Sequence, residues 1–470
     1  MKTGRQRSTT YDNLKIGFDE GLLATPWVYL SLPGGFIMSA LLTVHYGIGP
    51  GIYGVIASLP SWASALQIVL VPLISRYMDP RDMTLSMSWI NLGLWTMLAA
   101  VISFLPSEDA VVAGRIFLIF FALAAMSASL IGVGWVSWVS EWVPSRIRGK
   151  YFGRRNRFIS LITTFFLVVS MLTLDLFKDS ILAYQLILIS AVICRFFSVL
   201  WSHRIVAIDS DAPLIKASFK WTENLAGLRG NTDFKRMVVF GTLVGFWLAA
   251  IGPFYPVFVF EQLGWKPSAF AVVTVLATLG GAATMPLWGR MIDRYGCVPS
   301  ITASLLLWHG PNYYWAFLTP SNDWLLYPMW LWGGSVAGGF FLGTFNLVFK
   351  LIPSKSKTAA ISLNLAITSV AAGIAPVLVG ALLDLATKSG FSVLWSYRIG
   401  FLASPTFILL SLLVLLKIKE PSATARSYSL SGSGRLFRQL MQLQGLSFLA
   451  NATLFTRRRR NGRSRRKDGM

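Results

Sequence analysis

The chain has 470 residues, of which 54% are hydrophobic and 13% charged, with 42 Lys and Arg against 20 Asp and Glu. Soluble domains average about 25% charged residues, so this composition excludes an ordinary soluble enzyme and indicates a membrane protein. A nucleic-acid-binding protein could be this basic but not this apolar, so we expect no nucleic-acid partner. The two cysteines, Cys194 and Cys297, exclude a disulfide framework and a cysteine-rich metal site, and we expect no metal or cofactor.

Twelve apolar segments are long enough to cross a bilayer, which takes about 20 residues of helix. In chain order they cover residues 22–46, 51–74, 84–104, 113–140, 158–177, 181–202, 236–260, 268–289, 299–318, 325–349, 358–383 and 396–417. The segment 299–318 carries the weakest signal, because His309, Pro311 and Asn312 interrupt it. The longest polar connection, 203–235, divides the chain into halves of similar size.

Basic residues are concentrated in alternate loops. The segments 1–21, 75–83, 145–157, 203–236, 289–296 and 350–357 hold 23 Lys and Arg. The loops on the other side, 47–50, 105–112, 175–180, 261–267, 319–324 and 384–395, hold three, which are Lys178, Lys266 and Lys388. Because Lys and Arg in short loops stay on the cytoplasmic side, we predict that both termini and the central linker are cytoplasmic. A plasma (inner) membrane location is expected.

Two short motifs recur in the same order in both halves. Residues 72–79 and 286–293 share the pattern P-L-x-x-R-x-x-D, and residues 144–148 resemble residues 353–357. Their similar offsets indicate a duplicated six-span unit. We therefore predict an all-α integral membrane fold with twelve transmembrane helices in two pseudo-symmetric halves. The predicted order is a cytoplasmic N-terminus 1–21, a six-helix bundle 22–202, a linker 203–235, a second bundle 236–417 and a basic tail 418–470.

The loop motifs resemble those of the major facilitator superfamily. Residues 289–296 match its G-x-x-x-D-R-x-G signature, and residues 140–149 look like the S-E-x-x-P-x-x-x-R-G that ends its fourth span. The resemblance covers about residues 20–420 and implies a secondary transporter whose halves rock about a central substrate site. A Gln-Gln pair in span 7 and a P-E-S-x-R after span 6, both expected in sugar porters, are absent, which argues against a sugar substrate.

The resemblance also implies a gate at the cytoplasmic ends of the helices, formed in one state and broken in another. We expect it to contain Arg76, Asp79, Glu141, Pro144, Arg148, Gly149, Gly289, Arg290, Asp293, Arg294, Gly296 and Lys350. The glycines would allow tight turns, and Asp79 and Asp293 would cap nearby helices. Lys350 stands where the superfamily suggests an acid, and we expect it to pair with Asp293.

The remaining basic residues near the cytoplasmic side are expected to orient and anchor the helices rather than to form the gate. Arg154, Arg155 and Arg157 are read as positive-inside anchors. Arg195 lies about 10 Å from the inner end of its span by helical rise, so we expect it to snorkel to the surface. No Asp or Glu is evident at mid-depth, where a proton-coupled carrier usually has one.

The resemblance implies that spans 1, 4, 7 and 10 line the transport cavity. Aromatic rings there can stack on amphipathic organic molecules and attract cations. The candidate cavity residues are Tyr29, Phe36, Ser129, Trp135, Phe246, Trp247, Tyr255, Trp332 and Asn346. For Phe246 and Trp247, contact with lipid is an equally good interpretation.

The leading hypothesis is a secondary carrier, not an enzyme, for a small neutral or amphipathic organic solute, acting as a monomer. One alternative is an efflux carrier for apolar compounds, and another is a polytopic membrane protein that transports nothing. No G-x-x-x-x-G-K-[ST] loop is present, which disfavours an ATP-driven pump. Residues 421–470 hold eleven Lys and Arg and one acid, so the tail is predicted either to bind anionic lipid or to be disordered.

Overall fold

The structure is a computed structural model that describes residues 2–74, 77–206, 230–352 and 357–421, and these residues form helices without a strand. The elements up to residue 203 are α1 (Lys2–Leu30), α2 (Phe36–Ser39), the π-helix η1 (Ala40–His45), α3 (Pro50–Ile74), α4 (Pro80–Val101), the 3₁₀ turn η2 (Ile102–Phe104), α5 (Ala110–Trp142), α6 (Ser145–Leu176) and α7 (Ile181–His203).

The elements after residue 230 begin with α9 (Thr232–Ile251), α10 (Phe254–Glu261), α11 (Pro267–Tyr295) and α12 (Cys297–His309). They continue with the 3₁₀ segments η3 (Pro311–Phe317) and η4 (Asp323–Leu325), then α13 (Leu326–Leu351), α14 (Lys357–Lys388) and α15 (Val393–Leu415). The linker 207–229 and the tail 422–470 lie outside the described residues.

Ten segments of the described chain are helical, long and apolar enough to cross a membrane. They correspond to ten of the twelve predicted spans. The first predicted span, 22–46, is not one helix: α1 ends at Leu30 and α2 begins at Phe36. Pro33, Gly34 and Gly35 lie in the break. They account for it, because proline disfavours helical conformation in the preceding residue and glycine destabilises a helix. In the other direction α1 extends to Lys2, so the predicted N-terminal segment 1–21 is helical.

The ninth predicted span, 299–318, is also interrupted. Helix α12 ends at His309, and the chain continues as the 3₁₀ segment η3 from Pro311. Pro311 supplies no N–H and clashes with the preceding helical turn, so the α-helix stops there. The sequence signal was weakest at this position for the same reason.

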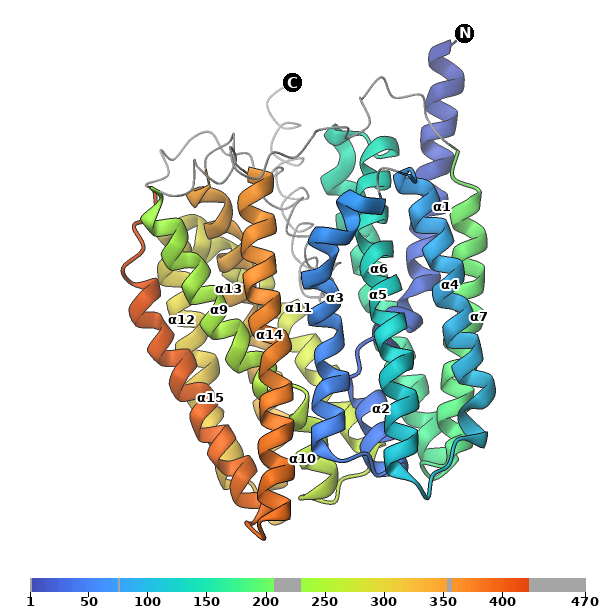
Figure 1. Cartoon of the computed structure of the whole chain (residues 1–470). Helices are drawn as coiled ribbons and strands as arrows, with labels where there is room; N and C mark the ends of the chain where they lie inside the picture. The colour runs from blue at the N-terminus through green and yellow to red at the C-terminus, as the bar shows by residue number, and fades with distance from the viewer. Residues whose placement is uncertain (1, 75–76, 207–229, 353–356, 422–470) are drawn as a thin grey trace, which may run out of the picture.

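The helices form two groups whose main contacts are made by two pairs of helices (Figure 1). Elements α1 to α7 lie on one side and α9 to α15 on the other; α3 packs against α14, and α6 packs against α11. We call the end of the molecule with residues 77–80, 142–145, 203–206, 295–297 and 416–421 the N-terminal face. We call the end with residues 46–50, 105–109, 177–180, 262–266 and 389–392 the opposite face.

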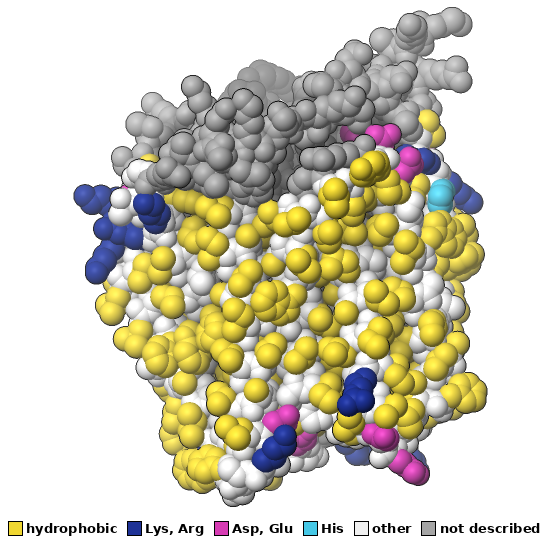
Figure 2. Space-filling model, viewed as in Figure 1, with side chains coloured by type: hydrophobic (Ala, Val, Ile, Leu, Met, Phe, Trp, Pro, Cys, Tyr) yellow, Lys and Arg dark blue, Asp and Glu magenta, His cyan; other side chains and the backbone are white. Residues whose placement is uncertain are grey.

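The flank of the molecule is suited to a bilayer (Figure 2). Hydrophobic side chains cover the middle of the visible face, and Lys, Arg, Asp and Glu gather near its two ends. Large apolar side chains are exposed on the long helices, including Met97, Ile119 and Leu172. In water such a surface would be unfavourable, whereas lipid solvates it.

The buried hydrophobic residues are arranged differently at the two faces. One large cluster, mostly toward the opposite face, combines residues of both groups, such as Phe36 and Tyr53 with Phe254 and Phe270. Toward the N-terminal face, one separate cluster contains only residues from 234 to 418. The other contains only residues from 14 to 205. Among the described residues, the two groups therefore share a core at the opposite face but not at the N-terminal face.

Candidate functional site

The gate residues of the first group belong to the N-terminal face, where α4 begins, α5 ends and α6 begins. Arg76 lies outside the described residues, and the side chains of Arg148 and Gly149 are also not described. Asp79 occupies the N-cap position of α4, yet its side chain makes no capping hydrogen bond, contrary to expectation.

Glu141, at the end of α5, is exposed. Partial burial, and then the negative charge of Asp79, raise the pKa of the Glu141 carboxyl. Pro144 follows in an extended conformation (φ −57°, ψ 135°) at the N-cap position of α6, which begins at Ser145. Together these residues bend the chain sharply between α5 and α6 at the N-terminal face.

The G-x-x-x-D-R-x-G motif divides into a helical part and a turn. Gly289 lies inside α11, and a Cβ atom there would meet nothing within 4 Å. Arg290, Asp293 and Arg294 are exposed on the last turns of the same helix, and Arg294 lies 5.3 Å from the ring centre of Tyr295. Gly296 has φ +96°, a conformation that favours glycine. Only this last glycine of the motif serves as the predicted turn.

Lys350 pairs with Glu420, which corrects the expected pairing with Asp293. The Lys350 Nζ atom contacts Glu420 Oε1. The other carboxylate oxygen of Glu420 accepts hydrogen bonds from the backbone N–H groups of Cys297 (2.8 Å) and Val298 (3.2 Å). Glu420 therefore caps α12, the role expected of Asp293 or Asp79, and joins α12 to α13.

The segment after α15 is fixed to the N-terminal face around this carboxylate. Arg236 donates to the backbone oxygen of Lys417 at 2.7 Å, and Lys419 N donates to Asp233 Oδ1 at 3.2 Å. Burial acts to raise the pKa of Glu420, but the hydrogen bonds from Lys350 and Val298 outweigh it, so the pKa is lowered. All these contacts lie within the second group of helices.

The first group contains a buried ion pair that sequence reasoning missed. Arg155 Nη2 lies 3.0 Å from Glu20 Oε2, and both side chains are 6% exposed. Arg155 Nε also donates to the backbone oxygen of Gly17 at 3.0 Å, and its guanidinium lies 4.8 Å from the ring centre of Trp135. Gly21 makes room for this arrangement, because a Cβ atom there would collide with the guanidinium of Arg155.

A second arginine is buried beside this pair. Arg195 is 3% exposed and does not snorkel; it donates to Ser88 Oγ (2.9 Å) and Ser198 Oγ (3.2 Å). Its guanidinium lies 4.2 Å from the ring centre of Trp27. Ser198 in turn donates to Glu20 Oε1 at 3.3 Å. We call Glu20, Arg155 and Arg195 the buried charge cluster; it ties α1 to α6 and α7.

The predicted cavity residues of the first group have local partners. Tyr29 makes edge contacts with Phe36 and Phe166, each at 6.3 Å between ring centres. Phe36 is buried and contacts Phe270 of α11 at 6.1 Å, across the two groups. Ser129 donates to the backbone oxygen of Ala63 at 3.1 Å. Trp135 is half-buried beneath Arg155. The structure thus brings Tyr29 and Phe36 together, and Trp135 joins the buried charge cluster.

The predicted cavity residues of the second group are mostly engaged with neighbouring helices. Trp247 stacks on Phe407 of α15 at 4.5 Å between ring centres, and Phe246 contacts the edge of Trp247 at 5.4 Å. Tyr255 packs on Trp315 and Phe401. Asn346 donates to Leu342 of its own helix.

Trp332 is placed away from the contact between the groups. Its side chain is 43% exposed, and its indole N–H donates to the backbone oxygen of Leu307 in α12 at 2.7 Å. The neighbouring Gly333 also faces α12, where a Cβ atom would approach Trp308. The structure therefore does not support Trp332 as a cavity residue.

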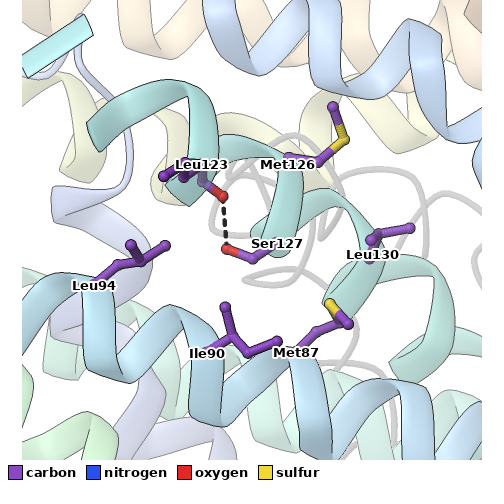
Figure 3. Close-up of a pocket in the computed structure, with 7 residues that line it drawn as sticks. All are labelled: Met87, Ile90, Leu94, Leu123, Met126, Ser127 and Leu130. Carbon is purple, nitrogen blue, oxygen red and sulfur yellow. Dashed lines mark hydrogen bonds between the residues drawn. The ribbon is translucent and has the colours of Figure 1, made fainter. Parts of the chain in front are cut away.

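A separate apolar groove lies between α4 and α5 (Figure 3). Its volume is about 220 Å³, and it is lined by Met87, Ile90, Leu94, Leu123, Met126, Ser127 and Leu130. Ile90 and Leu123 are each 52% exposed, so the groove opens on the apolar flank. The hydroxyl of Ser127 bonds the backbone oxygen of Leu123 and offers little polarity to an occupant.

Comparisons with known proteins agree with this architecture. Residues 237–458 match the family model of the Major Facilitator Superfamily. No curated protein is significantly similar to the chain in sequence. Among solved structures, the nucleoside transporter NupG is 14% identical with a TM-score of 0.63, over 87% of this chain and 100% of that one.

Two further structures show the same fold. A bacterial homologue of the iron transporter ferroportin in an inward-facing state is 12% identical, with a TM-score of 0.63 over 87% of this chain and 98% of that one. A bacterial homolog of the human lysosomal transporter Spinster, inward-facing and unoccupied, is 13% identical, with a TM-score of 0.58 over 89% and 99%. Residues 237–458 carry the family match, and the fold along most of the chain is that of solved membrane transporters, so these comparisons support a transporter of the major facilitator superfamily rather than an enzyme.

Proposed function

We propose that the protein is a secondary transporter that moves a small neutral or amphipathic organic solute by alternating access. Two six-helix halves, 22–202 and 236–417, would rock about a site between them. The interrupted segments α1–η1 and α12–η3 would complete the count of twelve, beside the ten segments that are long and apolar enough to cross a membrane. The protein would act as a monomer.

The observation that carries this proposal is the contrast between the hydrophobic clusters at the two faces. Buried residues of both halves share one cluster toward the opposite face, and each half has its own cluster toward the N-terminal face. A carrier that is closed at one end and open at the other has this arrangement. The inward-facing states of two similar folds agree with it, if the N-terminal face is cytoplasmic.

Loop charge supports that orientation. The predicted cytoplasmic segments hold 23 Lys and Arg against three in the others, and both described ends of the chain lie at the N-terminal face (Figure 1). The positive-inside rule then puts both termini in the cytoplasm. The tail 421–470, outside the described residues, would meet anionic lipid on that side.

The contacts of the buried arginines in the first group of helices support a weakly charged substrate. Arg155 is paired with Glu20, and Arg195 is covered by Trp27 and two serines. These side chains bond to neighbours within the first group of helices, although the Nε atom of Arg195 has no hydrogen-bond partner among the described residues. Tyr29 and Phe36, where the halves meet, offer aromatic surface for an amphipathic molecule, and Ser129, Phe246 and Asn346 remain proposed cavity residues.

An efflux carrier for apolar compounds is the second candidate, and one observation favours it. The groove between α4 and α5 opens on the apolar flank and contains two flexible methionines, Met87 and Met126. Methionine adapts to occupants of different shape. A compound dissolved in the bilayer could enter there.

Transport by the purified chain in liposomes tests the proposal. A panel of nucleosides, sugars, amphipathic amines, organic anions and apolar dyes is first assayed by thermal shift and then by counterflow. We expect at least one polar or amphipathic compound to stabilise the protein and to exchange saturably. Saturable movement of apolar dyes alone would favour the efflux alternative. Folded protein that moves none of the panel would contradict secondary transport.

A further inference from the structure

The two halves touch backbone to backbone where α3 crosses α14 near the opposite face. A Cβ atom at Gly54 would collide with the backbone oxygen of Pro376, and a Cβ atom at Gly380 would collide with that of Pro50. Pro376, Gly380 and Asp384 are spaced by four residues, so they lie on one face of α14. Small residues at such positions allow helices to approach closely in a membrane.

Asp384 lies at the end of this contact stripe, over the first turn of α3. A Cβ atom at Gly51 would collide with the carboxylate of Asp384, and one at Gly49 would lie 3.7 Å from its Oδ1 atom. The Asp384 side chain is half-buried. A carboxylate of the second half is thus in contact with the helix start of the first half.

The start of α3 is a favourable place for a negative charge. The first N–H groups of a helix have no partner within it, and together with the helix dipole they leave partial positive charge there. At α3 these groups belong to Gly51 and Ile52, since Pro50 has no N–H. Glycine at position 51 leaves this end open to the carboxylate.

A second contact between the halves lies beside the first. The hydroxyl of Tyr53, on the same helix turn, donates to the backbone oxygen of Pro253 at 2.8 Å. The Tyr53 ring meets Phe254 at 5.6 Å between centres. Tyr53 is fully buried, so this polar contact is made inside the shared cluster. The first turn of α3 is therefore held by the second half on two sides.

We propose that Asp384 and the Gly51 end of α3 form a latch that holds the opposite face closed and sets the ratio of the two states of the carrier. This inference rests on the alternating access proposed above. If α14 moved away from α3, the carboxylate and the helix start would both return to water, so the interaction stabilises only the closed state. Its strength is modest, because charge–helix interactions change an equilibrium about two- to fivefold at exposed sites.

Spin-label distances across the opposite face test the latch. Labels are placed at Ser107 and Ser389, exposed residues on different halves, in the full chain carrying Cys194→Ala and Cys297→Ala. We expect one predominant short distance. Asp384→Asn, which removes the charge at constant shape, should raise the fraction of the longer distance about two- to fivefold.

Further variants separate the latch from general damage to the fold. Gly51→Ala should also raise the long-distance fraction, and Asp384→Glu should retain the short distance. One control should behave like the parent: Gly93→Ala, where a Cβ atom meets nothing within 4 Å.

Unchanged distances in Asp384→Asn and Gly51→Ala, with folded protein, would overturn the latch. This readout needs no substrate, so it is distinct from the transport assay. If no compound of the panel is transported but the spin-label distance changes in Asp384→Asn, the proposed function is contradicted and the latch is still supported.

Discussion

The two faces of the molecule use their polar and small residues in different ways. At the opposite face, α3 and α14 meet through glycines and through Asp384, so the contacts cross between the halves. Toward the N-terminal face, Glu20 pairs with Arg155 within the first group of helices, and Glu420 pairs with Lys350 within the second group. The first arrangement holds the halves together, and the second makes each half rigid without joining it to the other.

This difference explains how a carrier could move without loss of its core. Ion pairs inside a half keep their partners when the halves rotate, so they resist unfolding but not rocking. Contacts between glycines across the halves are short-ranged, and a small displacement removes them. The predictions below ask whether stability and conformational equilibrium can be changed separately at the two faces.

Loss of the buried ion pair should produce the largest effect. Glu20→Gln leaves the Arg155 guanidinium buried without its counter-charge, which costs about 3–5 kcal/mol when a buried pair is broken. We expect strongly reduced thermal stability in detergent and low yield. Arg157→Ala, an exposed neighbour on the same helix, is the matched control. Equal melting temperatures for Glu20→Gln and the parent would show that the buried charge cluster does not stabilise the protein.

Overfilling the glycine contact should have the next largest effect. Gly54→Val places a branched side chain against the backbone oxygen of Pro376, and overpacking typically costs about 1–3 kcal/mol. Because the contact joins the halves, the cost falls on the closed opposite face rather than on either half. We expect the Ser107–Ser389 distance to lengthen while the melting temperature changes little. Gly93→Val is the control for helix propensity.

Removal of the α12 cap should have a smaller effect that depends on pH. Glu420→Gln loses a charged cap worth about 1 kcal/mol and the contact with Lys350. The pKa of Glu420 is lowered in the folded state, so its contribution is full above the unfolded pKa and is lost as pH falls through the folded value. The difference in melting temperature between parent and variant should therefore shrink in acid. A pH-independent difference would mean that packing, not charge, stabilises this end.

The smallest effect is expected at a glycine of the family motif. Gly289 lies within α11 and has open space where a Cβ atom would be. Gly289→Ala should change stability by less than about 1 kcal/mol, in the stabilising direction, because alanine favours helix. Transport should persist. Loss of transport would show that Gly289 contacts another segment in a second state.

The sequence was sufficient for the features that depend on local composition. Hydropathy predicted the ten apolar spans, and the family resemblance in the loops agrees with the family match. The breaks after Leu30 and His309 follow from Pro33 and Pro311, but only the second was recognised, because the first lies in a longer apolar run.

The charge pairs could not be predicted in the same way. In the sequence, Glu20 belongs to the polar N-terminal segment 1–21, and its partner Arg155 is 135 residues away. Arg155 itself resembled a loop anchor because it follows Arg154 in a basic stretch. The loop motif suggests Asp293 as the partner of Lys350, whereas Glu420, in the segment after α15, is the acid that contacts it. Such pairs depend on helix packing, which hydropathy does not specify.

Reciprocal motion of the two faces is the most direct test of alternating access. One label pair, Ser107 and Ser389, reports on the opposite face, and a second pair, at the exposed residues Asp82 and Lys417, reports on the N-terminal face. Both pairs are measured in lipid nanodiscs, in the parent and in Gly54→Val. We predict that the variant lengthens the first distance and shortens the second. Two distances that lengthen together, or a second distance that never changes, would contradict the account.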